Sequence, residues 1–124
     1  MENKIIVRRF ENTDLSQVRA LFITVNRLLS PAHLKDVFET YIASSMIEEI
    51  ARISEYYEER KGSFWVAESD SAIVGMFGLE ASGPDAMELR RMYVSPDCRR
   101  QGIAGKMLAF AEEYCRTINV LQLD

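Results

Sequence analysis

The chain has 124 residues, of which 48% are hydrophobic and 27% charged, and its formal net charge at pH 7 is −4. This composition is typical of one globular domain, and the acidic balance argues against a general nucleic-acid binder, which is usually basic. No apolar run approaches the roughly 20 residues that span a bilayer. Cys98 and Cys115 show neither metal-ligand spacing nor a disulfide framework. We therefore expect one cytoplasmic domain over residues 1–124, with no metal, no nucleic acid and no membrane partner.

The chain is expected to begin with a strand and a helix. Lys4–Phe10 carries consecutive β-branched residues, which favour a strand. Thr13 or Asp14 can then cap a helix, with Gln17 placed to complete a capping box with Asp14. Apolar residues at intervals of three and four predict the buried face of this helix. They are Leu15, Val18, Leu21, Phe22, Val25 and Leu29.

The segment from Ala32 to Arg60 keeps a helical pattern. The pair Ser44-Ser45 separates two apolar stripes and indicates a break, although one helix or two fit the pattern. The acidic side chains of the segment are interpreted as a solvated face rather than a binding site. They are Glu48, Glu49, Glu55, Glu58 and Glu59.

Three antiparallel strands are expected next. Ser63–Ser69 and Ala72–Glu80 are strand-like runs joined by a short polar turn, which predicts a hairpin. Gly75 and Gly78 inside the second run indicate the close approach of another backbone or a ligand, or a bulge. Ala86–Val94 follows another turn and is expected to be the central strand.

The most informative stretch is Met87–Gly105 (MELRRMYVSPDCRRQGIAG), which leads from that strand through a turn into an amphipathic helix. The first amides of a helix have no partner inside it and carry partial positive charge. Gly102, Ala104 and Gly105 would let a bulky anion approach them. The stretch is therefore interpreted either as a cradle for a phosphate or pyrophosphate, or as a purely structural junction.

The helix after this loop is expected to pack through one apolar stripe before a last strand, Asn119–Asp124, which would lie parallel to the central one. The stripe consists of Ile103, Met107, Ala111, Tyr114, Cys115 and Ile118. Basic residues gather in the same part of an acidic chain, which favours an anionic ligand there. They are Arg90, Arg91, Arg99, Arg100 and Lys106.

The segment Arg99–Ala104 (RRQGIA) spells R-x-x-G-x-A, follows M-Y-V-S-P and precedes the helix. This arrangement resembles the acyl-CoA-binding motif of the GNAT superfamily of N-acetyltransferases, and the order of the expected elements over nearly the whole chain is similar to that family. The resemblance implies an α+β, α/β/α sandwich-like GNAT fold with a mixed, mostly antiparallel sheet. It also implies an acyl-CoA ligand, usually acetyl-CoA, and transfer of its acyl group to a primary amine.

Carried over by position, the resemblance implies that the backbone of Met92 and Val94 pairs with the pantetheine arm and that the amides from Arg100 to Gly105 hold the pyrophosphate. The implied cofactor-binding residues are Met92, Tyr93, Val94, Arg99, Arg100, Gln101, Gly102, Ile103, Ala104 and Gly105.

Glu88 corresponds to an acidic general base that several family members carry on the long strand. Such a base is needed because an ammonium ion cannot attack a thioester. Regular alternation would place Glu88 on the same face as Arg90, Met92 and Val94. The alternative is that Glu88 only forms an ion pair with an arginine.

Family members usually continue into a further helix and two strands, which often supply a tyrosine that protonates the leaving thiolate. Because this chain ends at Asp124, we expect a C-terminally incomplete domain whose open edge is covered in a homo-oligomer. Two functions stay open: an N-acyltransferase acting on a small-molecule or protein amine, and a truncated acyl-CoA-binding or regulatory module with little catalysis. A third is an interaction domain whose loop binds an unrelated phosphate.

Overall fold

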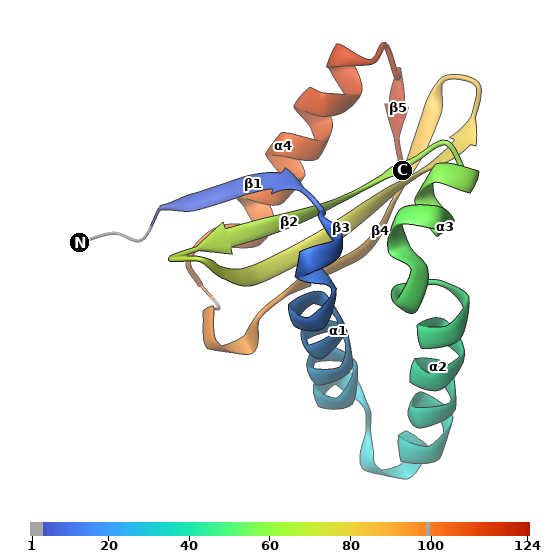
Figure 1. Ribbon diagram of the computed structural model, residues 1–124, viewed down its shortest axis with the longest axis vertical. Helices are drawn as coiled ribbons and strands as arrows, with labels where there is room; N and C mark the ends of the chain where they lie inside the picture. Colours follow the sequence, from blue (N-terminus) through green and yellow to red (C-terminus); the bar gives the residue numbers. More distant parts are fainter. Residues whose placement is uncertain (1–3, 99) are drawn as a thin grey trace.

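The computed structural model describes residues 4–98 and 100–124, and Figure 1 shows them arranged around one curved sheet. The sheet has five strands in the order β1-β2-β3-β4-β5. The first four pair antiparallel and β5 lies parallel to β4. The strands are β1 Ile5–Arg9, β2 Ser63–Ser69, β3 Ala72–Gly83, β4 Ala86–Val94 and β5 Gln122–Leu123. The predicted hairpin and parallel last strand are therefore confirmed, although the last strand is shorter than expected. The prediction that Ala86–Val94 is the central strand is wrong, because β3 is the middle strand and β4 lies next to the edge strand β5.

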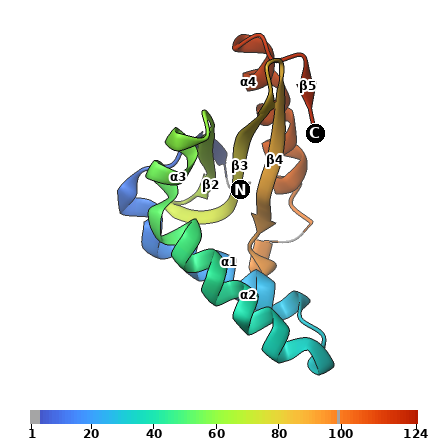
Figure 2. The ribbon, with the colours of Figure 1, turned by 90° about the vertical axis from the view of Figure 1, so that its right-hand side faces the viewer.

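Helices cover both faces of the sheet. Figure 2 shows α4 on the side of the strands opposite the other helices. The helices are α1 Leu15–Leu29, α2 Lys35–Glu48, α3 Ile53–Glu59 and α4 Ile103–Thr117, with short 3-10 turns at Asn12–Asp14, Ala32–Leu34, Ile50–Arg52 and Pro96–Cys98. This arrangement confirms the α+β prediction. Within residues 4–98 and 100–124, no helix is both long enough and apolar enough to cross a membrane.

The start of α1 differs from the predicted capping box. The Asp14 carboxylate instead accepts hydrogen bonds from the Glu11 amide (2.9 Å) and from both terminal nitrogens of Arg8 (both 2.8 Å). Gln17 does not cap the helix, because its side-chain oxygen accepts a hydrogen bond from the Ile73 amide of β3 (3.0 Å). Leu29, which was predicted to be buried, is 61% exposed.

The break between the two helical segments lies later than predicted. α2 runs through Ser44-Ser45 without interruption, and the chain turns at Glu49 into a 3-10 turn before α3. Glu49 was expected on a solvated acidic face, but it is only 2% exposed. That prediction is therefore wrong for Glu49, because Arg90 and Arg91 of β4 pair with its carboxylate.

The core forms one apolar layer on each face of the sheet. The layer under α1–α3 includes Val18, Phe22, Ile50, Ile53, Tyr57, Val66 and Met76. The layer under α4 includes Trp65, Phe77, Leu79, Ile103, Met107, Ala111 and Cys115. Of the stripe predicted for α4, only Ile118 is clearly exposed, because α4 ends one residue earlier.

Gly75 and Gly78 admit side chains from the two layers. A Cβ on Gly78 would lie 2.4 Å from the Tyr57 hydroxyl, and one on Gly75 would lie 2.9 Å from the Met107 sulfur. The prediction that another backbone or a ligand approaches these glycines is therefore wrong, because the groups nearest to their Cβ positions are side chains. The alternative prediction, a bulge, is confirmed, because the strand register shifts beside Gly75 and beside Gly78.

Candidate functional site: the open edge of β4 and the start of α4

β4 contains a β-bulge. Its register with β3 shifts between Arg90 and Tyr93, so that Arg91 and Met92 together oppose Phe77. Arg91 has φ 54°, in the left-handed region that side chains other than glycine rarely adopt. An extra residue of this kind interrupts the ladder and re-aims the strand beyond it.

The bulge reverses the side-chain alternation expected for β4. Met92 and Val94 pack with Met87 in the layer under α4, whereas Tyr93 packs in the layer under α1–α3. Since neighbouring residues of a strand point to opposite faces, Glu88 lies on the α1–α3 face, where it is exposed. The prediction that Glu88 shares a face with Met92 and Val94 is therefore wrong.

The bulge also changes which backbone groups face outward. The Leu89 amide donates to the Asp124 carbonyl, on the β5 side of β4 (2.9 Å). The Ser95 amide instead donates to the Val74 carbonyl of β3 (2.8 Å). The amide and carbonyl of one strand residue point the same way and alternate along the strand. Counting back from Ser95, the backbone groups of Met92 and Val94 face away from β3. Within the described residues, β5 pairs with β4 only in its first half, so these groups lie on an open edge.

The start of α4 is open to a ligand. Gly102 precedes the helix with φ 74°, and the first intrahelical bond runs from the Lys106 amide to the Gly102 carbonyl (3.0 Å). The amides of Ile103, Ala104 and Gly105 thus lie ahead of that first bond. The first turn of α4 contains no acidic side chain. Apart from its chain neighbours and the backbone of α4 itself, a Cβ on Gly102 or Gly105 would meet no atom of the described residues within 4 Å. These observations fit a pyrophosphate held at this terminus.

The basic residues that were predicted as one group do not form one. Arg90 and Arg91 point to the α1–α3 face, where they pair with Glu49. Arg100 and Lys106 are exposed beside the start of α4. Arg99 lies outside the described residues, so its predicted role has no structural account.

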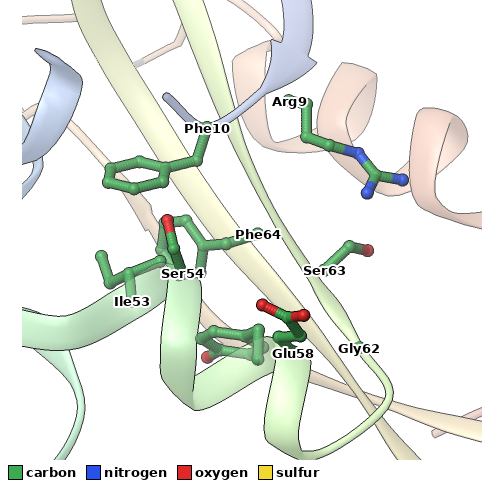
Figure 3. Close-up of a pocket in the computed structure, with 9 residues that line it drawn as sticks. Arg9, Phe10, Ile53, Ser54, Glu58, Gly62, Ser63 and Phe64 are labelled. Atoms are coloured by element: carbon green, nitrogen blue, oxygen red, sulfur yellow. The ribbon is translucent and has the colours of Figure 1, made fainter. Parts of the chain in front are cut away.

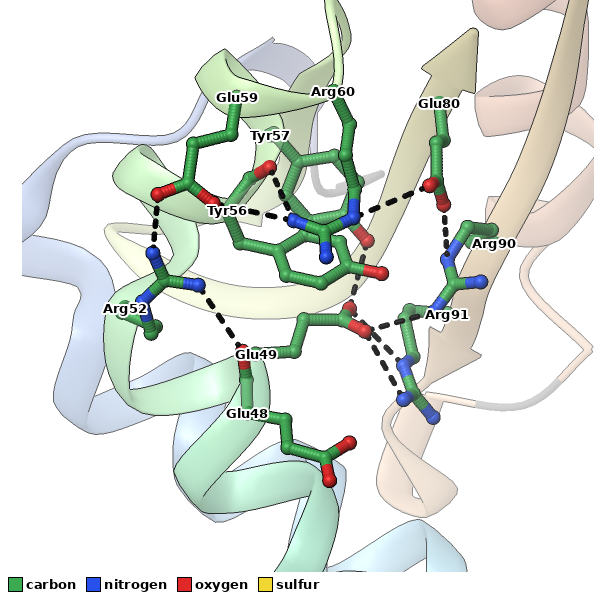
Figure 4. Close-up of polar contacts among 10 residues, drawn as sticks. All are labelled: Glu48, Glu49, Arg52, Tyr56, Tyr57, Glu59, Arg60, Glu80, Arg90 and Arg91. Carbon is green, nitrogen blue, oxygen red and sulfur yellow. Dashed lines mark hydrogen bonds and ion pairs between the residues drawn. The ribbon is translucent and has the colours of Figure 1, made fainter. Parts of the chain in front are cut away.

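Glu49 is the centre of a buried polar network, shown in Figure 4. Its carboxylate accepts hydrogen bonds from the Tyr57 hydroxyl (2.8 Å), Arg90 (2.8 Å) and two nitrogens of Arg91 (both 3.1 Å). Burial alone would raise the pKa of Glu49, but the hydrogen bonds from Arg91 and Tyr57 and the charge of Arg91 hold it below its ordinary value. Burial and the neighbouring Glu49 charge raise the pKa of Tyr57, which therefore stays protonated.

The network continues along the sheet away from Glu49. Arg90 Nε lies 3.2 Å from Glu80 Oε2, close enough for an ion pair but not aligned as a hydrogen bond. Glu80 also pairs with Arg60, whose guanidinium stacks on the Tyr56 ring at 3.7 Å. Glu88 opposes Glu80 in the ladder, and within the described residues it forms no ion pair. The alternative prediction, in which Glu88 pairs with an arginine, is therefore not observed among these residues.

Two other features lie away from this edge. The Tyr114 hydroxyl on α4 accepts a hydrogen bond from Arg9 (3.0 Å), beside the Trp65 ring. A hollow of about 270 Å³ opens between α3 and the ends of β1 and β2 (Figure 3). It is lined by Arg9, Phe10, Ile53, Ser54, Tyr57, Glu58, Gly62, Ser63 and Phe64. None of the predicted site residues lines it.

Comparison with known proteins decides what this arrangement belongs to. The model of the acetyltransferase (GNAT) family matches residues 28–124. The chain belongs to the GNAT acetyltransferase family. The resemblance carried by R-x-x-G-x-A is therefore confirmed.

Mammalian relatives support the assignment. Human N-acetyltransferase 8 is 32% identical over an alignment of 88 residues, and the match covers 66% of this chain and 39% of that protein. Rat N-acetyltransferase family 8 member 2 is 33% identical over an alignment of 81 residues, and the match covers 61% of this chain and 36% of that protein. The chain thus spans less than two fifths of the length of these relatives.

Solved structures share the fold at low identity. A GNAT acetyltransferase of Staphylococcus aureus has a TM-score of 0.72 at 18% identity, covering 94% of this chain and 70% of that one. The PaiA N-acetyltransferase of Thermoplasma acidophilum, solved in complex with coenzyme A, has a TM-score of 0.73 at 20% identity, covering 94% and 75%. These likenesses confirm the GNAT fold.

Proposed function

We propose that this chain is an acyl-CoA-dependent N-acyltransferase that moves an acetyl group from acetyl-CoA to a primary amine. The observation that carries the proposal is the outward-facing backbone of Met92 and Val94 on an open strand edge, which leads through a loop to the unobstructed start of α4. The family adds weight, because the PaiA neighbour was solved with coenzyme A. An N-acetylglutamate synthase of Neisseria gonorrhoeae with the same fold was solved with coenzyme A and N-acetyl-glutamate.

The donor would bind in two parts. The amide groups of the pantetheine arm would add to β4 as an extra strand does, through the backbone of Met92 and Val94 with Tyr93 between them. The pyrophosphate would accept hydrogen bonds from the amides of Arg100 to Gly105, with Arg99 contributing from the same motif. Partial positive charge at the helix start favours such an anion without any metal ion.

Glu88 is proposed as the general base. It would take a proton from the ammonium form of the acceptor, directly or through water, which leaves a neutral amine. The amine nitrogen then attacks the thioester carbonyl, a C–N bond forms, and the C–S bond breaks to release the thiolate. The amine loses its second proton as the amide forms, and the thiolate gains one. Glu88 is exposed on the α1–α3 face just before the bulge, so an acceptor would approach from that side.

The donor site is tested by placing a charge at the start of α4. Ala104→Glu puts a carboxylate in the first turn, where it suits the helix but repels a pyrophosphate. Ala109→Glu makes the same change at another exposed position in the middle of α4. Calorimetric titration with coenzyme A should show affinity falling about tenfold or more for the first variant and staying near wild type for the second. Equal affinities would place the pyrophosphate elsewhere.

Turnover is tested by thiol release from acetyl-CoA across a panel of amines. Glu88→Gln should lower kcat strongly and leave the coenzyme A affinity near wild type, because its side chain is not placed in the donor site. Full turnover by this variant would remove Glu88 from the mechanism. Tight binding of coenzyme A with no turnover for any amine would favour the acyl-CoA-binding module instead.

A further inference from the structure

The backbone at Arg91 needs an explanation. A residue with a Cβ at φ 54° is strained, and such a conformation persists only where the surroundings hold it. Glycine adopts the same conformation without this strain. The position nevertheless carries arginine, so its side chain is expected to supply what holds the backbone there.

Residues on one face of α2 and at its C-terminal end accept hydrogen bonds from the Arg91 guanidinium. Tyr41, Ser45 and Glu49 are spaced four residues apart, which places them along one side of a helix and its C-terminal end. Arg91 donates to the Tyr41 hydroxyl, to the Ser45 hydroxyl (3.4 Å) and to the Glu49 carboxylate (3.1 Å). It also lies over the Phe22 ring of α1 at 5.4 Å. Figure 4 shows the guanidinium of Arg91 directed at Glu49 from β4.

The bulge at Arg91 decides which backbone groups reach the open edge. If β4 continued from Leu89 without an extra residue, the outward groups would be those of Arg91 and Tyr93. With the extra residue, they are those of Met92 and Val94, as the Ser95 bond to β3 requires. The bulge therefore sets the register of the edge on which the pantetheine arm would lie.

We infer that Glu49 and Arg91 are positioning residues for the acyl donor: Glu49 holds Arg91 in the bulge, and the bulge turns the backbone of Met92 and Val94 toward the ligand. The inference rests on the proposed function for the identity of the ligand. In this view, the buried Glu49–Arg91 ion pair lies on the side of the sheet that faces the acceptor, but it helps to form the donor site on the edge of β4.

A pair of substitutions at Arg91 separates the backbone from the side chain. Arg91→Ala and Arg91→Gly both remove the guanidinium, but only glycine keeps φ near 54° without strain. Titration with coenzyme A should show Arg91→Gly within about threefold of wild type and Arg91→Ala weaker by about tenfold. Equal affinities for the two variants would overturn the inference.

Glu49→Gln tests the other partner, with Asp14→Asn as the matched control. Asp14 is also a buried carboxylate paired with an arginine, but it lies at the start of α1, and its polar partners among the described residues are Arg8 and the Glu11 amide. Glu49→Gln should weaken coenzyme A binding about tenfold, and the double variant Glu49→Gln/Arg91→Gly should recover most of the loss. A Glu49→Gln variant that binds as tightly as Asp14→Asn would show that the pair only stabilises the fold.

Amide exchange measured by NMR without ligand tests the bulge itself. In wild type and Asp14→Asn, the Ser95 amide should exchange slowly and the Met92 and Val94 amides quickly; in Glu49→Gln, the contrast should shrink at least tenfold. An unchanged contrast would overturn the inference whatever the ligand is. If the contrast shrinks but wild type binds no coenzyme A, the proposed function fails and the link between Glu49 and the bulge stands.

Discussion

Two buried carboxylates of this protein have the same kind of partner and different positions in the fold. Asp14 accepts two hydrogen bonds from Arg8 (both 2.8 Å) and one from the nearby Glu11 amide, so it joins β1 to the start of α1. Glu49 instead joins the end of α2 to Arg90 and Arg91, more than 40 residues later in the chain. Asp14 closes a local turn, whereas Glu49 connects a helix to an irregular point of the central sheet.

The surroundings of the two arginines make the difference sharper. The Arg8 side chain is 29% exposed and keeps a second partner in Glu68, whereas the Arg91 side chain is 11% exposed. Water can therefore reach Arg8 more easily if Asp14 is lost than it can reach Arg91 if Glu49 is lost. The cost of breaking a buried ion pair therefore depends on the counter-charges and water that the remaining charge can still reach.

Glu49→Ala should cause the largest loss of stability. It leaves Arg91 without its buried counter-charge, whereas Arg90 keeps Glu80 as a partner. Removal of one partner from a buried pair typically costs about 3–5 kcal/mol. Urea unfolding followed by circular dichroism would measure the loss. A loss below 1 kcal/mol would mean that water replaces the carboxylate freely.

Gly78→Ala should disturb the Glu49 network through Tyr57. The new methyl group would meet the Tyr57 hydroxyl, which donates to Glu49, and Tyr57 is fully packed. Overpacking of this kind costs about 1–3 kcal/mol. Gly75→Ala is the control, because Met107 is flexible and can move aside. Thermal unfolding should show the larger drop for Gly78→Ala, and the reverse order would contradict the described packing.

Asp14→Ala should cost less than Glu49→Ala. The Glu11 amide and Arg8 both lose an acceptor, but Arg8 retains Glu68 and some water, so we expect a loss of about 1–2 kcal/mol. The same urea titration measures it. A loss equal to that of Glu49→Ala would remove the distinction between the two carboxylates.

Acid should weaken both contacts. Hydrogen bonds from Arg8 lower the pKa of Asp14 against the opposing effect of burial, and the pKa of Glu49 is also lowered, from ordinary values of 3.8 and 4.5. Each group therefore contributes stability above its ordinary pKa that is lost as the pH falls through the folded value, since the unfolded chain then binds more protons. Wild type should lose stability below about pH 4.5 more steeply than Glu49→Gln or Asp14→Asn. Parallel pH profiles would contradict these shifts.

Local patterns in the sequence were sufficient for most elements of this fold. The β-branched run before Phe10 and the regular apolar spacing of α4 predict their structures because each is decided by neighbouring residues. The R-x-x-G-x-A motif located the start of α4 for the same reason, since a loop with Gly102 ahead of a helix start is a local feature.

Tertiary contacts decided what the sequence could not predict. Glu49 looks like its solvated neighbours until β4 brings two arginines to it, and the four-residue spacing of Tyr41, Ser45 and Glu49 is the only local signal. The bulge depends on that contact, so regular alternation misplaced Glu88 relative to Met92. Gln17 does not take part in a capping box because its side chain accepts a hydrogen bond from the Ile73 amide of β3.

We propose above that acyl-CoA lies along the open edge of β4 with its pyrophosphate at the start of α4. Residue-resolved amide exchange with and without coenzyme A tests this placement. We predict that coenzyme A slows exchange at Met92, at Val94 and at the amides of Ile103 to Gly105, and leaves the hollow around Phe10 and Ile53 unchanged. Binding that slows exchange elsewhere and not at these amides would contradict the account.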